Sequence, residues 1–372
     1  ARALYGAELH FSSSRIDVLA GCRFAHFLQY GLRAQEREPA EFDSRFYGTF
    51  VHDVLEHVVQ QTEREGGFAA VPRSRVQELA QERMEQNAQT LLETFPDSGR
   101  TGYLLRRTFD EVTQVVDELY DELSVSAFRP KFCELEFSAR GALPGVAFAG
   151  ERCRGVVEGF VDRVDVWQSG GRPYVRVVDY KTGKKSFDYT NVLHGRGLQM
   201  LLYLFALVRQ GGHLLHGEPL PAGVLYFPAR IERVSVRDRL AQAEIEKERR
   251  KQLRRSGVLL NSDPVLEAME PCGGSPRFLP YTLDKERRKT GDLASFVQLA
   301  QLERFVFRTV AALGDELADG CIDPDPCIRD AKDSACAFCP YSEICAGHEQ
   351  PRWLKKITAE EFWQTLERRE HG

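Results

Sequence analysis

Two aspartates and a lysine stand at the far end of a segment that otherwise predicts a β-hairpin. Gly170 and Gly171 lie between two runs rich in valine and aromatic residues, and a Gly-Gly pair in that setting favours a two-residue turn. With that turn, residues whose numbers sum to 341 face each other, so Asp162 lies opposite Asp179. Because side chains alternate between the two faces of a strand, Lys181 shares the face of both aspartates.

Opposed carboxylates of this kind call for a cation. Two carboxylates about 5 Å apart repel each other, and each loses hydration when the sheet is covered. A hard divalent ion with oxygen ligands, Mg²⁺ or Mn²⁺, suits such a pair best. Two simpler alternatives stay open. Lys181 alone neutralises the pair as a structural ion bridge, or a bulge shifts the register so that no pair forms.

Two predicted helices carry further polar residues. In FYGTFVHDVLEHVV, the histidine His52 lies beside an apolar stripe with helical spacing, which consists of Val51, Val54, Leu55 and Val58. The segment LQMLLYLFALV is too short to cross a membrane and predicts a buried helix. It holds Gln199 and Tyr203 one turn apart on the same face. Taken singly, each of these residues is typical of an ordinary helix.

The order of the motifs along the chain is GTFVH, GFVDRVD, VVDYKTG and QMLLY. This order resembles the RecB-like branch of the PD-(D/E)xK nuclease superfamily. The resemblance implies three side-chain ligands of Mg²⁺ or Mn²⁺, a backbone carbonyl ligand and a catalytic lysine: His52, Asp162 and Asp179, then Tyr180, then Lys181. It also implies that Gln199 and Tyr203 support the catalytic site. Glu56, one turn after His52, is either an outer partner of the metal or a plain exposed glutamate.

The cysteines indicate a second metal site. The chain has 9 cysteines, an odd number that favours metal ligation over a disulfide framework. Cys336, Cys339 and Cys345 form a compact C-x2-C-x5-C cluster in ACAFCPYSEICAG. Three thiolates need a fourth ligand. SSSRIDVLAGCRF places Cys22 on a predicted helix capped by serines, and Cys22 is the best remaining candidate by family resemblance.

In AddB-type nuclease domains and related RecB-like proteins, one early and three late cysteines hold a [4Fe–4S] cluster. The passages RRSGVLLNSDPVLEAME and CAFCPYSEIC are similar to that group. The resemblance therefore implies an iron–sulfur cluster on Cys22, Cys336, Cys339 and Cys345. Thiolates suit zinc about equally well on chemical grounds. Cys321 and Cys327 offer an alternative, because they could complete a zinc site with the tail cysteines.

The element pattern predicts an α/β fold. Helices are expected before residue 128, followed by the strand KFCELEFSA, the hairpin, the Gln199 helix and the strand GVLYFPAR. We expect a PD-(D/E)xK, restriction-endonuclease-like core with a mixed sheet flanked by helices. A cluster that draws ligands from both ends predicts one composite domain over 1–372. Its parts are a helical region 1–128, a catalytic core 129–232 and a helical region with the cysteine cluster 233–372. The initial alanine and the AddB resemblance favour the C-terminal part of a longer chain.

Composition favours a cytoplasmic protein without a membrane segment. Charged residues make up 28% of the chain, and the net charge is −5. For a nucleic-acid enzyme the distribution of charge matters more than its sum. Basic clusters occur at Lys184–Lys185, beside the predicted metal site, and at 249–255 and 287–289, which are interpreted as solvated helix faces.

These features predict a Mg²⁺-dependent DNA exonuclease that degrades single strands. The resemblance implies an AddA-like helicase-nuclease partner and a role in double-strand break processing and recombinational repair. TGKKS lacks the earlier glycine of a Walker A loop, so this chain is not expected to contain a motor. Two alternatives remain: a stand-alone CRISPR-associated RecB-like nuclease, and a catalytically inactive scaffold that binds DNA.

Overall fold

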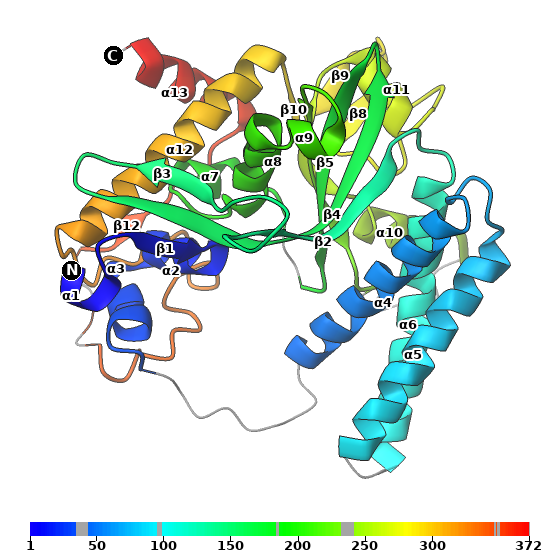
Figure 1. Cartoon of the computed structure of the whole chain (residues 1–372), viewed down its shortest axis with the longest axis horizontal. Helices are drawn as coiled ribbons and strands as arrows, with labels where there is room; N and C mark the ends of the chain where they lie inside the picture. The colour runs from blue at the N-terminus through cyan, green and yellow to red at the C-terminus, as the bar shows by residue number, and fades with distance from the viewer. Residues whose placement is uncertain are drawn as a thin grey trace.

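A mixed β-sheet of eight strands forms the centre of the chain in the computed structural model (Figure 1). The structure describes residues 1–34, 44–94, 99–183, 186–231, 242–345, 347 and 350–371. The strand order is β1-β4-β5-β6-β7-β10, and β2 and β3 also pair with β4. The strands are β1 (Leu9–Ser12), β2 (Arg129–Phe137), β3 (Val146–Ala149), β4 (Arg154–Ser169), β5 (Arg172–Lys181), β6 (Leu220–Pro228), β7 (Ser256–Leu260) and β10 (Leu293–Ala294).

The predicted hairpin is confirmed in its turn and its register. Gly170 and Gly171 have φ angles of 57° and 76°, as a primed two-residue turn requires. Strands β4 and β5 pair antiparallel from Ser169↔Arg172 to Arg163↔Val178, which keeps the expected sum of 341 throughout. The ladder ends there, one pair before Asp162 and Asp179 would meet.

Strand β4 joins the two halves of the sheet. Its first residues pair with β1 and β3, whereas its later residues pair with β2 and β5. Strand β6 follows β5 in parallel, as expected for strands that are connected through a helix. The mixed α/β core predicted from the sequence is therefore confirmed.

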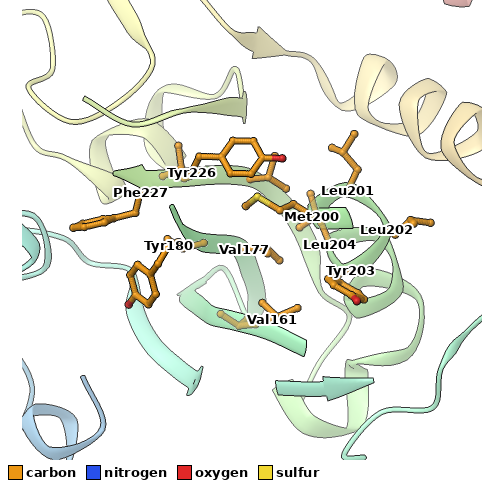
Figure 2. Packing of buried hydrophobic residues seen from close by; sticks show 14 of the residues in the cluster. Val161, Val177, Tyr180, Met200, Leu201, Leu202, Tyr203, Leu204, Tyr226 and Phe227 are labelled. Atoms are coloured by element: carbon orange, nitrogen blue, oxygen red, sulfur yellow. The ribbon is translucent and has the colours of Figure 1, made fainter. Parts of the chain in front are cut away.

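Helices cover both faces of the sheet. Helix α8 (Gln199–Gln210) packs against β5 and β6, and Val177 of β5 points toward it (Figure 2). Tyr180 and Phe227 point to the opposite side of the sheet (Figure 2). A three-helix arm lies on that side and consists of α4 (Ser44–Arg64), α5 (Arg73–Thr94) and α6 (Gly99–Leu123) (Figure 1).

The remaining elements are short or peripheral. The helices are α1 (Arg2–Tyr5), α2 (Ser13–Gly21), α3 (Arg23–His26), the π-helix Phe27–Gly31, α7 (Tyr189–Leu193), α9 (Gly212–Leu215), α10 (Gln242–Gln252), α11 (Asp263–Met269), α12 (Phe296–Ala318) and α13 (Ala359–His371). The strands are β8 (Tyr281–Leu283), β9 (Lys289–Gly291), β11 (Cys327–Ile328) and β12 (Arg352–Trp353). Within the described ranges, no helix is both long enough and apolar enough to cross a membrane.

Segments from opposite ends of the chain lie side by side. In Figure 1 the blue helices α2 and α3 adjoin the orange loop that follows α12. Arg23 binds Asp325 with an N–O distance of 2.7 Å and Glu316 with one of 2.5 Å. The thiol of Cys327 donates to the backbone carbonyl of Ala20 at 3.3 Å. Protein contacts alone therefore join the two ends at this place.

A network of buried charges holds α6 to the sheet. On the face of β4 and β5 away from α8, Arg163 and Arg176 both donate to Asp165, with distances of 2.8 Å. Glu122 of α6 lies 3.1 Å from Arg176 and 2.8 Å from Arg255. Burial alone would raise the pKa of Glu122, but the guanidinium groups of Arg255, Arg176 and Arg163 lower it to about 2. The carboxylate is therefore ionised, and it compensates several buried cations.

We predict that Glu122→Gln destabilises the fold by about 3 to 5 kcal/mol, because it leaves buried guanidinium groups without their counter-charge. Urea unfolding followed by circular dichroism measures the change. Glu82→Gln removes a carboxylate from an exposed ion pair with Arg75 and should cost far less, since water screens that pair. Equal losses for the two variants would contradict the importance of the buried network.

Candidate active site

His52 reaches the end of the hairpin from helix α4. The apolar stripe predicted for this helix is confirmed, since Val51, Val54, Leu55 and Val58 are fully buried. His52 lies beside it, with Nε2 2.9 Å from the backbone carbonyl oxygen of Tyr180 and Nδ1 3.5 Å from Asp162 Oδ2. The Nε2 contact with that carbonyl turns Nδ1 toward the Asp162 carboxylate, so both atoms could bind a cation between them.

Asp162 lies where the backbone pairing of β4 and β5 stops. Its Oδ2 accepts a hydrogen bond of 2.6 Å from the backbone N–H of Tyr180. A side-chain oxygen thus takes the place that the next ladder carbonyl would have. This bond joins Asp162 to the D-Y-K segment directly, and it aligns the Tyr180 carbonyl with His52.

Asp179 and Lys181 form a close pair on β5. Lys181 Nζ is 2.5 Å from Asp179 Oδ2, and the Asp179 side chain is only 7% exposed. The ammonium group also lies 5.9 Å from the ring centre of Tyr226 on β6. Lys181 therefore neutralises Asp179 in this structure, as the structural alternative expects. Asp162 instead contacts the Tyr180 N–H and His52.

Sequence reasoning missed Glu134 of β2. One ligand atom each from His52, Glu134 and Asp162 lie within 4.8 Å of one another. The β2–β4 register pairs Cys133 with Arg163 and Leu135 with Val161, so Glu134 lies level with Asp162. Glu134 also has a φ angle of 47°, an unfavourable backbone conformation for this residue type. The alternation in FCELEF places Glu134 and Glu136 on one face of the strand. It does not determine which residues pack against that face.

The electrostatics of the site favour a bound cation. Burial and then the Asp179 carboxylate raise the pKa of Asp162 to about 6, against the opposing effect of His52. Burial, Asp162 and two more carboxylates raise the pKa of Glu134 to about 7. Glu56 is one of the two, so it influences the site through its charge, while its Oε1 accepts a hydrogen bond from Gln60. The carboxylate and carbonyl oxygens suit Mg²⁺ or Mn²⁺, whereas the imidazole of His52 is the softer member of the set.

The residues Gln199 and Tyr203 occupy the first turns of α8. Tyr203 is 1% exposed, stacks on Phe137, and its hydroxyl donates weakly to the carbonyl of Glu158 at 3.4 Å. A β-carbon at Gly159 would collide with that hydroxyl, which explains the glycine of GFVD. Tyr203 therefore helps to position β4 through its contacts with Glu158 and Gly159. Gln199 is partly buried, one turn before Tyr203.

The four predicted cluster cysteines line one cavity of about 180 Å³, although they lie at opposite ends of the chain. Cys22, Cys336, Cys339 and Cys345 share it with mainly apolar neighbours, among them Phe24. Cys321 and Cys327 are not among its lining residues, and Cys327 faces Ala20 instead. One prediction about this region is wrong: Cys22 does not lie on a helix but caps the end of α2, because the chain turns there into α3.

The cavity brings together four thiols from both ends of the chain, and soft thiolate ligands suit an iron–sulfur cluster or zinc.

The three predicted basic clusters differ in the structure. Lys184 and Lys185 lie outside the described residues. The interpretation of the other two clusters as solvated helix faces is wrong in part, because some of their residues form tertiary contacts. Arg255 is buried against Glu122, and Lys289 belongs to strand β9, where it contacts Asp263.

We predict that metal-free protein loses stability as the pH rises from about 4.5 to about 7. Glu134 keeps its proton in the folded state over this range but loses it in the unfolded chain, so the folded state binds more protons. Glu134→Gln should flatten the pH dependence by roughly 1 to 2 kcal/mol, a value reduced for partial exposure. Urea unfolding in EDTA at several pH values measures it.

Glu136→Gln is the matched control for that measurement. Glu136 is on the same strand, and its Oε1 accepts a hydrogen bond of 2.7 Å from Ser138. An unchanged pH profile for Glu134→Gln, or an equal change for Glu136→Gln, would mean that the raised pKa does not belong to this site.

Known proteins provide an independent comparison. The family model described as "PD-(D/E)XK nuclease superfamily" matches residues 10–346. A relative from Moorella thermoacetica, named as a subunit of an ATP-dependent helicase/deoxyribonuclease, is 33% identical over 352 residues, covering 93% of this chain and 30% of that protein. A relative of the same name from Thermoanaerobacter sp. is 29% identical, with 99% of this chain and 33% of the relative covered. The chain thus spans about a third of the length of these curated relatives.

Proposed function

The chain belongs to the PD-(D/E)XK nuclease superfamily, and on that premise we propose that it is a metal-dependent deoxyribonuclease. One observation carries the proposal. His52, Asp162 and the Tyr180 carbonyl converge at the point where the β4–β5 ladder ends, and Asp179 and Lys181 lie on the same strand end. The names of the relatives, which include "deoxyribonuclease", favour DNA as the substrate.

The side chains divide the work of hydrolysis among them. Asp162, Asp179, His52 and the Tyr180 carbonyl would hold Mg²⁺ or Mn²⁺, and Glu134 is within reach of the same ion. When bound, the ion supplies a Lewis acid for the phosphate and lowers the pKa of a coordinated water. Lys181 would orient the attacking water and offset charge on the phosphate oxygens. The water oxygen bonds to phosphorus and releases a proton to solvent, the bond from phosphorus to the 3′ oxygen breaks, and that oxygen takes up a proton from solvent. The products would carry 5′-phosphate and 3′-hydroxyl ends.

Single-stranded DNA is the substrate that we propose for this site, with exonucleolytic removal of nucleotides. The relatives are named as subunits of an ATP-dependent helicase/deoxyribonuclease. We therefore propose an AddA-like helicase-nuclease protein as the partner that unwinds DNA, in double-strand break processing and recombinational repair. The cytoplasm, where the chromosome of a bacterium lies, is the place we propose for this work.

We predict that Asp179→Asn and Lys181→Met each reduce Mg²⁺-dependent degradation of single-stranded DNA by at least about 100-fold, because the first removes a carboxylate that would hold the ion and the second removes the cation that would offset charge on the phosphate. Release of nucleotides from an end-labelled oligonucleotide measures the rate. Asp110→Asn and Lys355→Met make the same chemical changes at exposed positions and should cleave like the parent. DNA binding without cleavage by the parent, in either Mg²⁺ or Mn²⁺, would instead favour the inactive scaffold.

We further propose that Cys22, Cys336, Cys339 and Cys345 hold a [4Fe–4S] cluster. Their common cavity supports this assignment. When bound, such a cluster would link residues more than three hundred positions apart in sequence. Closing so long a loop restricts the unfolded chain strongly. With the contacts of Arg23, it would make residues 1–372 one composite domain around the catalytic core.

We expect anaerobically purified protein to be brown, with broad absorbance near about 400 nm that Cys22→Ser abolishes. The same substitution should lower the unfolding temperature of the whole chain, because it opens the long loop. Cys272→Ser replaces a cysteine outside the cavity and should keep both the colour and the stability. Colourless parent protein that contains one zinc ion per chain would overturn the cluster and leave the active-site proposal intact.

A further inference from the structure

Three arginines converge on a hollow between helices α12 and α13, away from the candidate active site. The hollow has a volume of about 310 Å³, and Arg304, Arg308 and Arg369 line it together with Phe305 and Glu370. The two helices lie against each other near the C-terminal end of the chain (Figure 1). Three guanidinium groups face a single carboxylate there, in a chain whose net charge is −5.

The charges in this hollow are only partly compensated. Glu370 pairs with Arg304 at 2.5 Å and also accepts a hydrogen bond from Gln301. Arg308 and Arg369 have no ion pair with any described residue. Arg304 and Arg308 are one turn apart on α12, and like charges at this spacing destabilise a helix. The helix pair therefore holds two arginines without a direct ion pair in a concave site, although Arg304 together with Arg308 lowers the pKa of Glu370.

Further arginines lie between this hollow and the candidate active site. His194, just after α7, is close to Arg369 and to Arg196, Arg329 and Arg352, and burial together with these cations lowers its pKa. Arg196 in turn lines a second hollow of about 320 Å³, together with Tyr226, Asp17 and Asp188. Tyr226 is the β6 residue that pairs with Asp179. The arginines between the two places are paired with aspartates, as in Arg329 with Asp188 and Arg352 with Asp325, so Arg308 and Arg369 of the α12–α13 hollow are the better candidates for binding an anion.

We propose that the hollow between α12 and α13 binds a backbone phosphate of single-stranded DNA that is held on its way to or from the active site. The proposal rests on the nuclease function above and adds a contact site for the substrate. Guanidinium groups match phosphate oxygens in charge and in geometry. Phe305 is 9% exposed and forms the floor beneath Arg369, so the site offers cations more than stacking surfaces. This character favours the sugar–phosphate backbone over the bases.

The test uses protein that binds DNA without cutting it. Asp179→Asn serves as the parent, and a fluorescent 30-nucleotide oligothymidine is titrated at several KCl concentrations. Adding Arg308→Ala and Arg369→Ala should weaken binding about tenfold or more. It should also make the slope of log K against log salt shallower by about 0.7, because the hollow holds one phosphate and each phosphate contact on a single strand contributes about 0.7.

Arg368→Ala with Lys355→Ala is the matched control. It removes two exposed positive charges from the same C-terminal region, at positions that do not line the hollow. Melting temperatures equal to the parent's show that both doubly substituted proteins are folded. The control should keep the parent's salt slope.

The outcomes separate this proposal from the nuclease proposal. A reduced slope for the hollow variant alone supports the phosphate site even if the unsubstituted chain cleaves nothing. An unchanged slope, an equal reduction in the control, or failure of the parent to bind overturns it even if the chain is an active nuclease. Unchanged DNA binding together with lost binding of poly-L-glutamate would assign the hollow to an acidic protein segment, and would also overturn it.

Discussion

The hydrogen bond from the Tyr180 backbone to the Asp162 side chain is the interaction on which the site depends. It is formed where the β4–β5 ladder ends, and it replaces a backbone acceptor with a carboxylate. Asp162 is therefore tied to the strand that carries Asp179 and Lys181. The same residue, Tyr180, presents its carbonyl to His52. One local departure from regular pairing thus arranges the proposed ligands from two strands and one helix.

The rest of the core keeps that departure in place. On one face of the hairpin, the buried charges of Arg163, Asp165 and Arg176 tie the two strands to Glu122 of α6. On the other face, α8 packs apolar side chains against β5 and β6, and Tyr203 fits over Gly159. The charged face demands exact partners because an unpaired buried charge is costly. The apolar face tolerates more variation, since its packing depends mainly on volume and shape.

We expect the acidic groups at the site to make the metal-free fold less stable than it would be with neutral side chains. Glu134 adopts an unfavourable backbone angle, and its nearest charged neighbours raise its pKa rather than lower it. Such strain is typical of functional sites, where the surrounding structure maintains it. A divalent ion would reverse the sign of the local electrostatics. The arginines on α12 and α13 repel one another in the same way as the acidic groups at the site. A bound phosphate would reduce that repulsion, as a divalent ion would for the carboxylates.

Local sequence determined the hairpin, because a Gly-Gly turn and period-two alternation set the register without help from distant residues. It also determined the buried stripe beside His52, and the motif order was enough to indicate the family. Only the tertiary structure decided that Glu134 joins the site. Strand β2 carries a bulge near Lys131, and its register against β4 depends on packing between segments that are not adjacent in sequence. Likewise, the sequence could name four cysteines, but their meeting in one cavity required the two ends of the chain to pack together. Pairing between nearby residues is encoded locally, whereas contact between distant ones is settled by the burial of the whole core.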